Sequence, residues 1–178
     1  MAVSWIAFTY AHGPTSYNLD RTVFDRNIFF WGAMLGGPPN LLVGLGLILL
    51  YPTLLKGASR LVKAGYALTL VGLVVPALMD LFFWGALGPP FFIPLVGLGL
   101  ILLGLGSRGN PQLSSQYLNL LILIGICQVI GFALALIPLE ISDPFGGYRV
   151  TGLFAYFFTG LGFAALGVSF WKRHPGSH

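Results

Sequence analysis

A small group of polar side chains near the ends of long apolar runs could support binding or catalysis: Asp80, Glu140, Asp143, Asn40 and Arg149. Asp80 is the strongest candidate, because an acid inside a membrane costs roughly 2.5–3.5 kcal/mol at the helix centre and usually marks a proton or cation site. The other interpretation is an acid at the membrane surface, hydrated by outside water and paired with Arg21, Arg26 or Arg149. The sequence alone favours this surface interpretation.

Glu140 ends the fourth apolar run much as Asp80 ends the second, so these two acids could border one polar cavity on the outer side. Asp143 and Arg149 follow in the next connection and could complete the cluster. Their residue types suit an ion or a small polar ligand. We therefore treat the four side chains together as candidates for one outward-facing site.

Motifs for metal, phosphate or nucleophile chemistry are absent from the sequence. It has no HExxH, CxxC, GxSxG or P-loop pattern. His12, His174 and His178 all lie outside the apolar runs, which excludes haem held by two histidines between helices. The lone Cys127 cannot form a disulfide within the chain. No metal and no cofactor are predicted, although apolar grooves could hold lipid, quinone or pigment, and these absences weigh against an enzyme.

The elements that position these side chains follow from composition. The chain is 56% hydrophobic and 8% charged, with a mean hydropathy of +0.86, whereas soluble domains carry about 25% charged residues. Runs without any charge are long enough for membrane helices, which need about 20 apolar residues. We predict an all-α integral membrane protein with five spans at residues 38–55, 62–83, 90–106, 117–138 and 151–171. The domains are an N-terminal segment 1–37, the bundle 38–171 and a tail 172–178.

The charges divide between the two sides that five spans create. One side carries most of the basic residues, namely Lys56, Arg60, Lys63, Arg108, Lys172 and Arg173. The other side carries every acid, namely Asp20, Asp25, Asp80, Glu140 and Asp143. Because basic loops stay in the cytoplasm, the N-terminus is expected outside and the C-terminus inside, in an inner or plasma membrane. The basic residues form no patch for nucleic acid.

Two phrases occur twice with the same offset of 53 residues. FFWGA stands at residues 29–33 and 82–86, and VGLGLILL stands at residues 43–50 and 96–103. The spans that carry them run in the same direction, so this is a parallel internal repeat. The residues before the first copy alternate apolar and charged types near helical spacing. They predict an amphipathic helix on the outer surface that turns into the first span at residues 36–39, GGPP.

Small residues recur at helical spacing within the spans and predict close helix packing. The residues predicted to pack helices together are Gly65, Thr69, Gly72, Gly97, Gly104, Gly125, Gly160 and Gly167, with the larger Gln128 among them. The amides of Asn40 and Gln128 are more typical of hydrogen bonds between helices than of ligand sites. Some small-residue faces are expected to remain for partners outside the chain.

Three functions are compatible with these features. The first is a non-catalytic accessory or scaffolding subunit of a larger membrane complex, with membrane lipids and other membrane subunits as partners. The second is a small oligomeric transporter or channel with an outward acidic vestibule. The third is a membrane-embedded enzyme acting on lipid, for which the sequence offers no nucleophile or metal set. We favour the first.

Overall fold

The computed structural model describes residues 22–83, 92–111, 113–136 and 157–173, in which regular structure is helical and no strand is formed. The helices are α2 (Ile28–Leu49), α3 (Tyr51–Leu55), α4 (Arg60–Phe83), α5 (Ile93–Gly106), α6 (Ser115–Leu136) and α8 (Thr159–Arg173). By length and composition α4 and α6 could cross a membrane, and the apolar parts of α2, α5 and α8 are shorter. The predicted all-helical class is confirmed, and the count of five spans stays a prediction.

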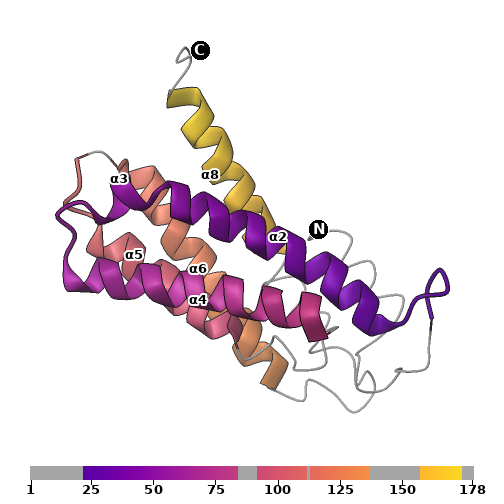
Figure 1. Cartoon of the computed structure of the whole chain (residues 1–178). Coiled ribbons are helices and arrows are strands. Elements are labelled where there is room, and N and C mark those ends of the chain that lie inside the picture. Colours follow the sequence, from indigo (N-terminus) through magenta and orange to yellow (C-terminus); the bar gives the residue numbers. More distant parts are fainter. Residues whose placement is uncertain (1–21, 84–91, 112, 137–156, 174–178) are drawn as a thin grey trace.

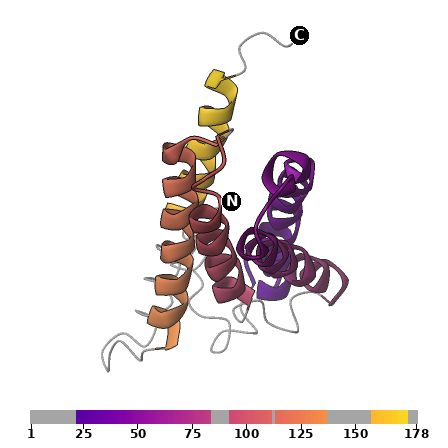
Figure 2. The ribbon, with the colours of Figure 1, turned by 90° about the vertical axis from the view of Figure 1, so that its left-hand side faces the viewer.

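The long helices pack in chain order. α2 lies on α4, α4 on α5, α5 on α6, and α6 on α8. The contacts make an open row rather than a closed ring, which begins with α2 and ends with α8, and Figures 1 and 2 show that this row is curved. Each end helix therefore has one main helix neighbour among the described elements.

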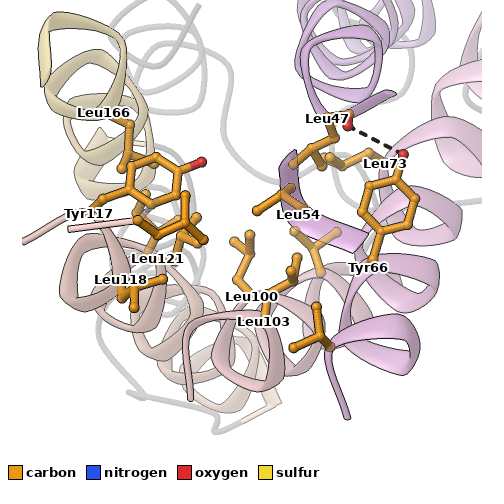
Figure 3. Packing of buried hydrophobic residues seen from close by; sticks show 14 residues of the cluster. Leu47, Leu54, Tyr66, Leu73, Leu100, Leu103, Tyr117, Leu118, Leu121 and Leu166 are labelled. Carbon is orange, nitrogen blue, oxygen red and sulfur yellow. Dashed lines mark hydrogen bonds between the residues drawn. The ribbon is translucent and has the colours of Figure 1, made fainter. Parts of the chain in front are cut away.

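The core is a continuous cluster of buried aliphatic side chains with two tyrosines. Leu100 and Leu103 of α5 are fully buried at its base, and Leu54 of the short α3 lies in the middle of the cluster (Figure 3). The Tyr66 hydroxyl donates a hydrogen bond to the Leu47 carbonyl at 3.3 Å, which ties α4 to the end of α2. The row is thus held by both apolar contact and a buried polar link.

The chain before α2 is not the amphipathic helix that the sequence predicts. Val23 and Arg26 pair across a tight turn in which Phe24 and Asp25 have positive φ angles, 51° and 55°. Asn27 then caps the helix by accepting a hydrogen bond from the Phe30 N–H at 3.0 Å. That prediction is wrong for residues 22–27, because local turn and cap bonds replace the helical ones. Residues 1–21 lie outside the described part.

The predicted turn at residues 36–39 is also wrong, because α2 runs without interruption through Pro38 and Pro39. The boundary drawn at residue 37 therefore falls inside a helix. Proline removes a backbone donor and crowds the preceding turn, but it can bend a helix without ending it. In apolar surroundings a broken helix would leave several more backbone groups without partners, so continuing through the prolines is the less costly course.

The remaining predicted spans overlap the helices closely. The second and fourth spans, 62–83 and 117–138, correspond to Arg60–Phe83 and Ser115–Leu136. The first span is displaced: α2 ends at Leu49, and a separate helix begins at Tyr51, followed by Pro52. The third matches Ile93–Gly106, and part of the fifth, at 151–156, lies outside the described residues.

Candidate functional site

Asp80 lies near the end of α4 and is only 3% exposed. Its carboxylate faces the backbone of α2, since a Cβ built on Gly36 would stand 2.9 Å from its Oδ2 atom. No hydrogen bond or ion pair joins Asp80 to a residue in the described part of the chain. Arg26, one of its expected partners, lies instead over the Phe30 ring, 5.1 Å from the centroid.

α2 covers Asp80, whereas the surface interpretation, in which outside water hydrates the acid, stays a prediction. Its neighbour Gly36 stands eight residues after Ile28, the first residue of α2. At about 1.5 Å per residue, α2 therefore extends about 12 Å past the carboxylate. The sequence distance from Asp80 to the end of its own helix could not reveal this cover, because the neighbouring helix provides it.

Glycine and proline shape the part of α2 that faces Asp80. A Cβ on Gly37 would stand 2.9 Å from the Leu81 side chain and 3.3 Å from the Ala77 carbonyl, so both α2 glycines permit the close approach of α4. Pro38 and Pro39 follow directly and have no N–H to donate to the carbonyl oxygens one turn earlier. The two prolines therefore lower the number of backbone donors in this part of α2.

Asn40 is half-buried and follows Gly36 by one helical turn, which puts the two residues on the same side of α2. The sequence predicts that the Asn40 amide bridges two helices by a hydrogen bond. In the structure, Asn40 forms no hydrogen bond to another described residue. Glu140, Asp143 and Arg149 lie outside the described residues, so the predicted acidic cluster is not tested. Within the described part, no group of three or more His, Cys, Asp or Glu side chains could hold a metal.

The predicted small residues of α4 lie against α5. A Cβ on Gly65 would stand 2.7 Å from the Gly99 carbonyl oxygen, and one on Gly72 would stand 2.7 Å from the Val96 side chain. Thr69 is fully buried between them and donates its hydroxyl hydrogen bond to the Gly65 carbonyl at 2.8 Å. The two backbones are therefore in direct contact along this face.

The glycines of α5 and α6 meet in the same way on the next face. A Cβ on Gly97 would stand 2.8 Å from the Gly125 carbonyl oxygen, and one on Gly104 would stand 2.9 Å from the Leu118 carbonyl oxygen. Because backbone atoms cannot move aside as a side chain can, these positions admit little beyond hydrogen. This is the packing mode that small residues provide between membrane helices.

The contact between α6 and α8 includes a polar link. The Gln128 amide donates a hydrogen bond to the Thr159 hydroxyl at 3.2 Å, and both side chains are buried. Gly162 supplies the close approach, because a Cβ there would overlap the Ile124 side chain. Sequence reasoning did not single out Thr159 or Gly162, although Gly162 belongs to the segment TGLGFAALG with its small residues at helical spacing.

The two glycines of α8 that the sequence predicts for packing differ from Gly162. Gly160 is half-buried, and Gly167 is exposed, with no described residue within 4 Å of its Cβ position. The helix thus has one glycine used inside the row and another left on its outer side.

The repeated VGLGLILL segment is packed differently in its two copies. In α5, Gly97 lies against α6 and Gly99 lies against α4. In α2, Gly44 lies against Val74 of α4, but no described residue lies within 4 Å of the Cβ position of Gly46. Gly44 corresponds to Gly97 and Gly46 to Gly99, so the first copy lacks the neighbour that the second copy has on its preceding side.

Around Gly46 the outer face of α2 is apolar and exposed. Leu42, Leu45 and Leu49 are 69%, 52% and 72% exposed and recur at intervals of three and four residues. This spacing puts them on one helical face together with Gly46. We name the four residues Leu42, Leu45, Gly46 and Leu49 the outer α2 face.

The chain was compared with protein-family models, curated proteins and solved structures. No protein-family model matches the chain. No curated protein and no solved structure matches it either.

Proposed function

We propose that this protein is a non-catalytic integral membrane subunit that spans the bilayer five times and packs against another membrane protein in a larger complex. The observation that carries the proposal is the unequal packing of the repeated segment. Gly99 of α5 is packed against α4, whereas Gly46 of α2 is packed against none of the described helices. A partner helix on the outer α2 face would complete the pattern.

The composition of the outer α2 face supports a helix rather than lipid alone as its occupant. Leucines exposed to lipid need no explanation, because acyl chains are as apolar as the leucines. A glycine among them is different, since it costs about 0.5–1 kcal/mol relative to alanine in a helix and permits close backbone approach. The glycine of the equivalent position in α5 serves such an approach.

The charge distribution supports the orientation. Arg60 and Lys63 lie at the start of α4, and Arg108 follows the end of α5. Because α4 and α5 are antiparallel neighbours, these basic residues lie on the same side of the helices. With basic connections in the cytoplasm, the start of α2 and the end of α4 face outside. The partner would then be another protein of the same inner or plasma membrane.

A photoreactive benzophenone side chain in place of Leu45 tests the proposal in native membranes. The control carries it in place of Leu123 of α6, which is similarly exposed, 55% against 52%. We expect ultraviolet light to join the Leu45 variant to one other membrane protein, identified by mass spectrometry, and the Leu123 variant to lipid only.

Three results would contradict the proposal. Adducts with lipid alone from both variants would leave the outer α2 face to the bilayer. An adduct with residues 1–21 of the same chain would mean that the chain covers this face itself. An adduct with a second copy of the chain, in particles that contain no other protein, would favour the oligomeric alternative.

A further inference from the structure

The surroundings of Asp80 pose a charge problem that the subunit role does not address. Asp80 is 3% exposed, and burying an ion without a partner carries a penalty of several kcal/mol. α2 and α5, which pack on α4, contain no charged residue, and the next basic residue along α4 is Lys63, more than four turns away. The one titratable side chain of α3, Tyr51, contacts Tyr66 at the other end of α4.

The α2 side of this carboxylate presents backbone and an amide residue rather than a charge. Gly36 brings the helix backbone against Oδ2, and Asn40 follows one turn later on the same side of α2. In the same part of α2, Pro38 and Pro39 leave the carbonyl oxygens of Met34 and Leu35 without their helical N–H donors. An acid inside a membrane usually marks a proton or cation site, and backbone carbonyl oxygens without helical donors can serve as ligands of Na⁺.

We propose that Asp80, together with the α2 segment Gly36–Asn40, forms a site for one small monovalent cation, either a proton or Na⁺. The cation neutralises the carboxylate where Asp80 meets the α2 backbone at Gly36. A divalent ion does not suit the site, because Ca²⁺ and Mg²⁺ take several oxygens that usually include more than one carboxylate, and Asp80 is the only acid on α2, α4 or α5. This site goes beyond the subunit role and is measured on the isolated chain.

Dicyclohexylcarbodiimide tests the site, because this apolar reagent reacts with protonated carboxyl groups and not with carboxylates. The protein is treated in mild detergent at pH 8 in choline chloride, and its peptides are weighed by mass spectrometry. We expect an adduct on Asp80 and none on Asp25, which is exposed and serves as the internal control. The Asp80→Asn variant should give no adduct.

Two arms separate the proton from Na⁺. If the site binds Na⁺, replacing choline with NaCl at constant pH should slow the labelling of Asp80 at least tenfold, and KCl should not. If the site binds a proton alone, raising the pH should slow labelling and NaCl should have no effect. Labelling of Asp80 that is no faster than that of Asp25 in any of these solutions would count against the site.

A second measurement covers the case in which the reagent cannot reach Asp80. A cation that binds only the folded protein raises its thermal unfolding midpoint. We expect NaCl or lower pH to raise that midpoint in the wild type and not in Asp80→Asn. Gly36→Ala should also reduce the effect, because its methyl group would stand 2.9 Å from Oδ2.

Gly44→Ala is the matched control, since its methyl group meets a side chain of the same α4 helix at 3.0 Å but lies two turns from Asp80. It should leave the cation response intact. Failure of both labelling and cation-dependent stabilisation in the wild type overturns the proposal. That failure would leave crosslinking from the outer α2 face unaffected, so the two proposals fail separately.

Discussion

The segment VGLGLILL has a helix on both sides in α5 and on one side in α2. Its second glycine lies against Gly65 and Thr69 in the α5 copy, whereas no described residue lies within 4 Å of the Cβ position of the equivalent Gly46. The two copies are identical in sequence, so the difference comes from their position in the row. The repeated segment is therefore packed against helices on two sides in the middle of the row, and on one side at its end.

The largest expected effect comes from adding bulk at the glycines that differ most between the copies. Gly99→Val should reduce the free energy of unfolding by about 3 kcal/mol, the upper part of the range for overpacking, because its side chain would meet α4 backbone atoms at 2.6 and 2.7 Å. Gly46→Val should change it by less than about 0.5 kcal/mol. Unfolding of both variants in mixed micelles of increasing denaturing-detergent content measures the difference. Equal losses would mean that another part of this chain covers Gly46.

A smaller effect is expected at the first glycine of each copy, which is packed in both. Gly97→Ala should destabilise the protein by about 1–2 kcal/mol, because the methyl group would stand 2.8 Å from the Gly125 carbonyl oxygen. Gly44→Ala should have a weaker effect, since it meets a Val74 methyl group at 3.0 Å and that side chain can turn. The same unfolding assay ranks them. A larger loss for Gly44→Ala would show that the end of the row is packed more rigidly than its middle.

The smallest effect concerns the other end of the row, where a hydrogen bond joins α6 to α8. A double-mutant cycle with Gln128→Leu and Thr159→Val should give a coupling energy of about 0.6 kcal/mol, the average for such bonds between membrane helices. The pair is buried, with 3.2 Å between amide nitrogen and hydroxyl oxygen. A coupling of zero would mean that this hydrogen bond does not stabilise the contact between α6 and α8. The α8 end of the row would then gain no stability from this polar link.

Sequence reasoning located the helices well where one apolar run stands between polar connections. α4 and α6 begin within two residues of the predicted spans and extend to Phe83 and Leu136, where the described residues stop, because run length and flanking charge decide where such helices begin. It failed at residues 36–39, where two glycines and two prolines are typical of a turn. In the structure the same residues admit the close approach of α4 within an unbroken helix. Composition cannot distinguish these outcomes, since the neighbouring helix decides between them.

The candidate site shows a similar limit. Asp80 was identified from its residue type and its place in an apolar run, but its cover by Gly36 depends on how far α2 extends past it. Thr159 lies inside the predicted fifth span, 151–171, and nothing in its spacing pairs it with Gln128. Pairings between residues 31 or more positions apart come from tertiary packing, which a single sequence does not report.

The row order of the helices has a consequence for biosynthesis. Each long helix described, from α4 onward, packs on the long helix described before it, so most stabilising contacts join segments close in the chain, an arrangement associated with fast folding. A nascent chain could add each helix to a finished edge without waiting for the C-terminus. α2 is synthesised before the others, and its outer face would be available to meet another protein while the ribosome is still extending α8.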